Sequence, residues 1–296
     1  MNERLRENRW EEAAAELDRY LTFLRTCSAW WYADHSFGNQ DLEKWTSCSE
    51  IGHVLETKDH VTICVESKER TWELMIYPVV GGFRMISGKK GFFDGQPEAF
   101  SVEESEHAYI IRSKEHEMIL QKETLEISID RKAITNLKNI SFIFEKESVS
   151  ASRIQFSIHE NSAIYGFGER FDSVNQYGKT VALWQRDACE GCLASIGNQA
   201  YKNIPLVHTS DGFSFFANTS YRMRMDVGDA VQDYLSVEAL GDVFDFYIWS
   251  GTPREAMTAY GTLTGLPIFP PEWVFEPWAG GGGGRWRNGP LQLSLI

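Results

Sequence analysis

IYGFGERF, residues 164–171, begins as a strand and then turns sharply. Its first two residues suit a pleated, half-buried surface. Gly166 and Gly168 then permit backbone angles or close approaches that a side chain would block. Glu169 and Arg170 are adjacent opposite charges, followed by an apolar anchor. Taken alone, the stretch predicts a β-bulge or a strand-end turn held by an ion pair.

Short strand-like runs surround this stretch from about residue 50 to about residue 250. Charged or glycine-containing turns separate them, as is typical of an antiparallel sandwich and not of alternating βαβ units. The sequence therefore predicts a mainly β, antiparallel sandwich domain. Its strand candidates are VTICV (61–65), WELMIYPVV (72–80), AYIIR (108–112), MILQ (118–121), LEISID (125–130), SFIFEK, RIQFSI, NIPLVHT, FSFFAN, YRMRMDV and VFDFYIW.

Helical patterns flank the strands on both sides. Apolar residues recur at spacings of three and four over about 7–26, which predicts an N-terminal helix. A second helix is predicted over 254–263, with Thr252 as N-cap, Pro253 in its first position and Gly265 at its end. The segment LPIFPPEWVFEPW follows, with a rigid Pro-Pro linker. Residues 273–275 within it are expected to form the first strand of another domain.

Composition limits the classes of partner. The net charge of −13 argues against nucleic acid and against an anionic membrane surface, because both are bound through Lys and Arg. Neutral sugars remain compatible with this charge. The ten tryptophans and eleven tyrosines suit sugar stacking and sandwich cores equally.

The N-terminus and the cysteines bear on localisation. The N-terminus lacks the apolar run of a secretory signal, and five irregularly spaced cysteines argue against a disulfide framework. We expect a cytoplasmic protein without a membrane span. Cys189 and Cys192 form one C-x-x-C pair, which allows half a zinc site or a redox pair, but a free-thiol loop is favoured because no second ligand pair is present. We expect neither a metal nor a cofactor.

Four ordered segments resemble the N-terminal portion of glycoside hydrolase family 31, which contains α-glucosidases, α-xylosidases and α-transglucosidases. The resemblance covers residues 160–290 best, is weaker over 50–160 and is absent over 1–45. It implies a galactose-mutarotase-like sandwich, then a helix and a linker that runs into a (β/α)₈ barrel. The segments are YGFGERF (165–171), LWQRDA (183–188), AYKNIPLV (200–207) and GLPIFPPEWVFEPW (265–278).

The resemblance also implies substrate-binding residues. In the family, a sandwich loop reaches over the barrel mouth, and its Asp hydrogen-bonds sugar hydroxyls; that position matches Asp187 here. Trp184 would offer a ring face to a pyranose, and Trp278 is the third substrate-binding candidate. The plainer alternative makes Asp187 an ordinary loop carboxylate and Trp184 a core residue. Glu169 and Arg170 are expected to support the sandwich.

The expected order is an N-terminal helical extension (1–48), the β-sandwich (49–251), a connecting helix (252–266), and a linker with the first strand of a truncated, incomplete (β/α)₈ barrel (267–296). Family members are retaining enzymes with two carboxylates on later barrel strands. The family's WxDMNE-type nucleophile segment does not occur in this sequence. We therefore expect no catalytic residue here and no activity of these residues alone.

The main hypothesis is the N-terminal region of a retaining α-glycosidase that acts on α-linked glucosides or oligosaccharides by hydrolysis or transfer. The first alternative is a non-catalytic carbohydrate-binding or interaction module. The second is a mutarotase-like enzyme, which would need a His and Glu pair in a cleft. Trp273, Phe275 and Trp278 would normally be covered by the barrel, so we also expect self-association through this surface.

Overall fold

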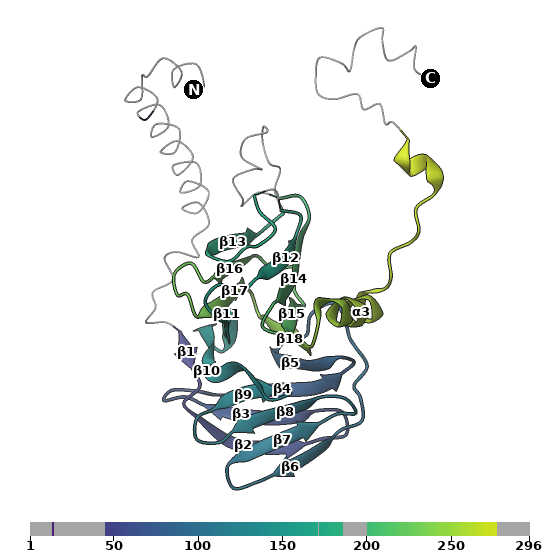
Figure 1. The fold of residues 1–296 in the computed structure, drawn as a ribbon. Coiled ribbons are helices and arrows are strands. Elements are labelled where there is room, and N and C mark those ends of the chain that lie inside the picture. Colours follow the sequence, from purple (N-terminus) through teal and green to yellow (C-terminus); the bar gives the residue numbers. More distant parts are fainter. Residues whose placement is uncertain (1–13, 15–44, 171, 186–199, 277–296) are drawn as a thin grey trace. The chain divides into compact units, whose positions relative to one another are not determined.

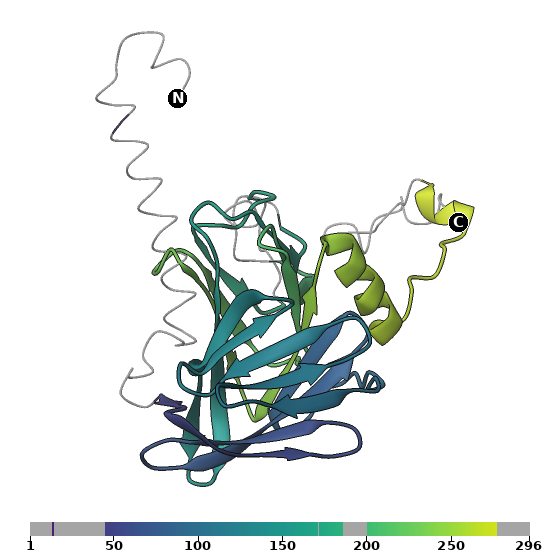
Figure 2. The same cartoon turned by 60° about the horizontal axis from the view of Figure 1, so that its bottom comes forward.

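The computed structural model describes residue 14 and residues 45–170, 172–185 and 200–276. The chain divides into two compact units, residues 1–264 and residues 265–296. The first unit holds two antiparallel sheets, which lie face to face (Figures 1 and 2). The predicted helix over 7–26 and the glycine run at 280–284 lie outside the described residues.

The larger sheet has ten strands, and each pairs with its neighbours in antiparallel fashion. In spatial order its strands are β13 (Lys179–Leu183), β16 (Met223–Val227), β17 (Tyr234–Leu240), β11 (Ser148–Ser157), β10 (Lys132–Glu145), β9 (Glu126–Ile129), β8 (Glu117–Gln121), β7 (Ala108–Arg112) and β6 (Ser101–Glu104), with β1 (Thr46–Ser47) on β10.

The smaller sheet has eight strands and joins the two ends of the domain's sequence. Its strands in spatial order are β12 (Ile164–Gly168), β14 (Asn203–Thr209), β15 (Phe213–Ala217), β18 (Val243–Ser250), β5 (Gly82–Gly88), β4 (Thr71–Val79), β3 (Val61–Glu66) and β2 (Glu50–Glu56). Strands β12 and β13, at corresponding ends of the two sheets, border the candidate site.

The core fills the space between the sheets. Period-two alternation sends one face of each strand inward, so that β16 buries Met223, Met225 and Val227 and leaves the residues between them partly exposed. Aromatic rings from opposite sheets meet there, with Phe156 of β11 stacked on Phe215 of β15 at 4.7 Å between centroids. The predicted antiparallel sandwich is confirmed.

Strand β18 is buried on both faces, which explains its unbroken apolar run VFDFYIW. Its outward side chains Tyr247 and Trp249 belong to a second apolar cluster, completed by Ala256 and Ala259 of helix α3 (Pro253–Thr264). Figure 1 shows α3 beside β18 and β15. The outer face of the smaller sheet is therefore covered around β18 within the first unit.

Helix α3 begins and ends where the sequence predicts. The Thr252 hydroxyl accepts from the Glu255 amide at 3.3 Å, and the Glu255 carboxylate accepts from the Thr252 amide at 2.7 Å. These two bonds form a capping box in front of Pro253. The helix stops before Gly265, whose φ of +91° suits a glycine.

The second unit differs from the expected strand. Residues Glu272–Phe275 form a short 3₁₀ helix, which the Pro271 carbonyl closes by accepting from the Val274 amide at 3.1 Å. A strand needs a neighbour to pair with, and the structure describes no other strand between residues 265 and 276. The backbone there makes local turn bonds instead, from the Val274 amide to Pro271 and from the Glu276 amide to Trp273.

Candidate functional site

The first five residues of the IYGFGERF motif form strand β12, which has a bulge at its end. Gly166 has a φ of +111° and Gly168 a φ of +83°, and the pairing register with β14 shifts between them. A Cβ at Gly166 would overlap the Leu206 carbonyl, and one at Gly168 would overlap the Lys202 carbonyl. The prediction that these glycines allow close backbone approach is confirmed, and the pairing of β12 with β14 ends at Gly168.

Arg170, directly after the bulge, joins the motif to the next strand. Its guanidinium donates to the Phe167 carbonyl at 3.2 Å and to the side-chain oxygen of Asn203. The sequence predicted a turn held by an ion pair with Glu169; the hydrogen bonds described for Arg170 run to Phe167 and Asn203. These two hydrogen bonds agree with the expected role of Arg170 in supporting the sandwich.

Asn203 is the meeting point of three of the quoted segments. The side chain of Gln185, in the LWQRDA segment, accepts from the backbone amide of Asn203 at 2.9 Å and donates to the backbone carbonyl of Asn203 at 3.1 Å. The Asn203 side chain donates to Gln185 at 3.2 Å and to the Ala200 carbonyl at 3.1 Å. We call Arg170, Gln185 and Asn203 the Asn203 junction. It ties together chain segments that leave β12, leave β13 and enter β14.

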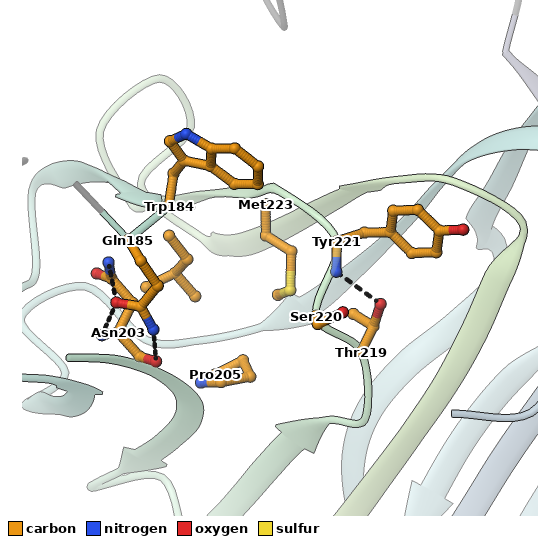
Figure 3. Close-up of a pocket in the computed structure, with 9 residues that line it drawn as sticks. Trp184, Gln185, Asn203, Pro205, Thr219, Ser220, Tyr221 and Met223 are labelled. Atoms are coloured by element: carbon orange, nitrogen blue, oxygen red, sulfur yellow. Dashed lines mark hydrogen bonds between the residues drawn. The ribbon is translucent and has the colours of Figure 1, made fainter. Parts of the chain in front are cut away.

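A hollow of about 340 Å³ opens beside this junction (Figure 3). Leu183 and Met223 contribute apolar surface from adjacent strands, Pro205 comes from β14, and the turn between β15 and β16 closes another side. Its lining residues are Leu183, Trp184, Gln185, Asn203, Pro205, Thr219, Ser220, Tyr221 and Met223.

Trp184 lines the hollow and is 43% exposed, so it is not a core residue. Figure 3 shows its indole ring at the rim above Met223. An apolar floor with an exposed indole at the rim can take the C–H face of a flat, partly apolar ring, while nearby amides and hydroxyls offer hydrogen bonds. Trp184 as a sugar contact stays a prediction.

The other predicted substrate-binding residues, Asp187 and Trp278, lie outside the described residues, as do Cys189 and Cys192 of the C-x-x-C pair. The sequence did not single out the turn Thr219–Tyr221 as a site, because YRMRMDV was interpreted as a strand from Tyr221 onward. In the structure β16 begins only at Met223. The Thr219 hydroxyl accepts from the Tyr221 amide at 3.1 Å and holds this turn.

The turn between β12 and β13 is held by charge. Lys179 donates to Asp172 at 2.6 Å, and the buried Gln176 donates to the other carboxylate oxygen at 3.1 Å. Burial alone would raise the pKa of Asp172, but the hydrogen bonds from Lys179, Gln176 and the Ser173 amide outweigh it and lower the pKa. The carboxylate thus stays ionised and fixes the approach to β13.

A second hollow, of about 400 Å³, has a His–Asp pair at its edge. His159 Nδ1 lies 3.2 Å from Asp211, and the same carboxylate accepts from the Ser162 hydroxyl at 2.6 Å and from the His159 amide at 3.2 Å. The carboxylate of Asp211 therefore accepts hydrogen bonds that hold a turn. Because His159 is 87% exposed and bonded to the acid itself, the pair is not arranged as a separate acid and base around a sugar.

Buried charges lie on the far side of the smaller sheet from the core. Arg84 of β5 donates to both Asp245 oxygens, at 2.8 and 2.6 Å, and also to Asp94. Asp245 accepts further from the Asn218 side chain at 2.9 Å and from the Gly91 amide at 2.7 Å. We call Arg84, Asp94, Asn218 and Asp245 the Arg84 cluster.

The Arg84 cluster serves the fold. Burial would lower the pKa of Arg84, but the hydrogen bonds and charge of Asp245 outweigh it and raise the pKa. Arg84 also donates to the Phe93 carbonyl at 3.0 Å, so that the cluster fastens the segment around residues 91–95 over the sheet. Its charges are fully paired and do not line the hollow beside Trp184.

Comparison with known families settles the identity of this sandwich. Residues 60–226, more than half of the chain, match the glycosyl hydrolase 31 N-terminal galactose mutarotase-like domain. The chain belongs to this family. The bulged strand, the Asn203 junction and the hollow are thus features of a family 31 N-terminal domain.

Relatives of this family 31 domain are much longer proteins. It is 34% identical over 131 residues to α-xylosidase XylQ of Lactiplantibacillus pentosus, covering 44% of this chain and 16% of XylQ. It is 25% identical over 182 residues to α-glucosidase 2 of Bacillus thermoamyloliquefaciens, covering 59% of this chain and 22% of that protein. The chain therefore spans about a sixth to a fifth of these relatives.

A solved structure shares the fold of the family 31 domain. The cycloalternan-forming enzyme of Listeria monocytogenes, in complex with a pentasaccharide substrate, superposes with a TM-score of 0.70 at 18% identity. The superposition covers 78% of this chain and 23% of that one. In the part of the chain that the structure describes, no helix is long and apolar enough to cross a membrane.

Proposed function

We propose that this chain forms one wall of the substrate pocket of a retaining α-glycosidase that hydrolyses or transfers α-glucosyl residues. The observation that carries the proposal is the hollow beside Trp184, built where three family segments meet at Asn203. The relatives named as an α-xylosidase and an α-glucosidase support α-linked sugars as the substrate class.

The proposed division of labour follows from the residues present. Trp184 stacks on a pyranose, Asp187 accepts hydrogen bonds from its hydroxyls, and Trp278 contributes a further apolar contact. The nucleophile and the acid/base belong to the barrel of the family and are not among these residues. We propose that the chain alone binds sugar weakly and does not cleave it.

A binding titration together with an activity assay tests this proposal. The 296-residue chain is titrated with maltose, isomaltose and xylose, and the same sample is incubated with an aryl α-glucoside. We expect measurable binding that is weakened most in Trp184→Ala and less in Asp187→Ala, and no turnover. Absence of binding, or turnover well above the uncatalysed rate, would contradict it.

A non-catalytic sugar-binding module is the second candidate, favoured by one observation: among the residues that the structure describes, those that line the hollow all belong to the sandwich. The two candidates differ in what happens when the sequence is joined to a family 31 barrel. A pocket wall should raise kcat/KM of the assembled enzyme, and Trp184→Ala should reduce it. A separate module should leave kcat/KM for a small aryl glycoside unchanged.

Two further proposals concern the setting of the protein. We propose a reducing, cytoplasmic compartment, supported by Cys48 and Cys64, which are buried free thiols. Burial raises the pKa of Cys48 to about 11, so this thiol is not reactive at neutral pH.

We also propose self-association through Trp273 and Phe275, which are 57% and 75% exposed; sedimentation of Trp273→Ser would test it.

A further inference from the structure

Tyr221 is an exposed aromatic ring at the edge of the hollow, and the structure fixes it in place. The residue lies in the turn between β15 and β16, and 42% of it is exposed. Figure 3 shows it on the side of the hollow opposite Gln185 and Asn203, with its ring directed outward. It therefore borders the hollow without filling it.

Two contacts hold the Tyr221 ring, and a third holds its backbone. Its hydroxyl lies 3.1 Å from a carboxylate oxygen of Asp242, to which it can donate, and its backbone amide donates to the Thr219 hydroxyl at 3.1 Å. Its ring rests on the backbone of Gly241, where a Cβ would lie only 2.7 Å from the ring atoms Cγ, Cδ2 and Cε2. One ring face is thus covered by a glycine, and the exposed area belongs to the rest of the ring.

This arrangement matches what a stacked sugar requires. A rigid ring loses little conformational freedom when a ligand binds, and a planar aromatic surface fits the C–H face of a pyranose. The phenol hydroxyl is hydrogen-bonded to the Asp242 carboxylate, so a ligand would meet the face of the ring and not its hydroxyl. The hydroxyls of Thr219 and Ser220 lie beside it at the margin of the hollow.

We propose that Tyr221 is the stacking platform for a second sugar unit, so that the site selects oligosaccharides over monosaccharides. The proposal rests on the proposed function, in which the first unit lies against Trp184. The second unit extends past Met223 and the Thr219–Tyr221 turn. A single stacked ring of this kind changes affinity by about two- to tenfold.

The experiment compares monosaccharide and disaccharide affinity in matched variants of the 296-residue chain. Glucose, maltose and isomaltose are titrated against the unmodified chain, Trp184→Ala, Tyr221→Leu and Tyr221→Phe by calorimetry. Tyr165→Leu is the control, because Tyr165 is 37% exposed but does not line the hollow. Melting temperatures are recorded for every variant.

We expect the unmodified chain to bind a disaccharide about two- to tenfold more tightly than glucose. Tyr221→Leu should remove that preference while leaving glucose affinity unchanged, and Tyr221→Phe should keep it. Trp184→Ala should weaken both ligands, and Tyr165→Leu neither. A purely structural role of Tyr221 would move the melting temperature without moving the preference.

The outcomes separate this inference from the proposed function. If Trp184→Ala weakens all sugars but Tyr221→Leu leaves the preference intact, Tyr221 is only a cover for Gly241 and the proposed function stands. If the unmodified chain binds no sugar, both fail. Should Tyr221→Leu unfold the turn, saturation-transfer NMR on the unmodified chain decides: protons of the second sugar ring must receive saturation, and their silence overturns the inference.

Discussion

The Arg84 cluster and the Asn203 junction are both networks of polar side chains, but they differ in burial. Arg84 is 1% exposed and the Asp245 side chain is fully buried, and their charges are paired with each other. At the Asn203 junction Gln185 is exposed and Asn203 half-buried. A buried charge without a partner is strongly destabilising, so the groups of the Arg84 cluster are all used to pair one another. The half-exposed groups of the Asn203 junction can instead shape a binding surface.

The largest effect is expected from breaking the Arg84 cluster. Asp245→Ala leaves the Arg84 guanidinium buried without its main partner and should lower the free energy of unfolding by roughly 3–5 kcal/mol, measured by urea denaturation. Asp94→Ala is the control within the same cluster. The Asp94 side chain is 67% exposed, so its loss should cost only about 0–1 kcal/mol. Equal losses would refute the distinction that burial makes.

The next effect concerns the bulge in front of the Asn203 junction. In Gly168→Ala the side chain strains a left-handed backbone and displaces the Lys202 carbonyl, together roughly 3 kcal/mol by urea denaturation. Gly178→Ala is the matched control: its φ is +77°, but a Cβ there would meet nothing within 4 Å. That variant should lose only the backbone part, about 1–2 kcal/mol. Comparable losses would mean that close approach is unimportant.

A smaller effect is expected from the junction itself. Asn203→Ala removes the side-chain bonds to Gln185, Ala200 and Arg170 and should cost about 1–2 kcal/mol in the same assay. Asn136→Ala is the control: it removes two solvent-exposed hydrogen bonds of an equally half-buried asparagine away from the hollow and should cost about 0.5–1 kcal/mol. Sugar affinity should fall in the Asn203 variant alone; if it does not, the junction serves only the fold.

The smallest effect is a pH dependence of the folding stability that arises from His208 in β14, the strand that carries Asn203. Burial lowers the pKa of His208 from 6.5, so below that pH the unfolded chain binds a proton that the folded chain excludes. The stability that His208 contributes is therefore complete above pH 6.5 and is lost as the pH falls through its lowered pKa. Arg84 stays charged throughout.

Chemical denaturation between pH 7.5 and 5 measures this dependence. His208→Gln should show a shallower loss of stability than the unmodified chain, and the lowered pKa of His60 is common to both proteins. Parallel pH curves for the two proteins would show that His208 contributes nothing to the slope.

The sequence predicted those parts of the fold whose signals are local. AYIIR coincides with β7 because a short run rich in aromatic and β-branched residues is bounded by charged turns, and α3 follows from its own cap residues. Strand β5, GFRMISG, was not among the predicted runs, because glycines and a central Arg84 weaken its strand pattern. Arg84 is tolerated in that strand only through Asp245, 161 residues away, which no local pattern reveals.

The site was predicted in part for the same reason. Trp184 stood in a quoted segment, and the structure places it on a hollow. Asn203 and Gln185 stood in two different segments, and only the fold shows that they bond to each other. Tyr221 was missed because its run alternates as a strand does, while a hydrogen bond from its backbone amide to Thr219 turns it into the margin of the hollow.

The pairing of β5 with β18 has a consequence for biosynthesis. The smaller sheet closes only when residues 243–250 join a strand that left the ribosome much earlier, at residues 82–88. At about 5–20 residues per second, β5 waits on the order of ten seconds or more with an open edge. Until then Arg84 has no Asp245 partner and the edge can pair with other chains. The nascent domain should therefore depend on chaperones until about residue 250 has emerged, and slow synthesis should favour aggregation.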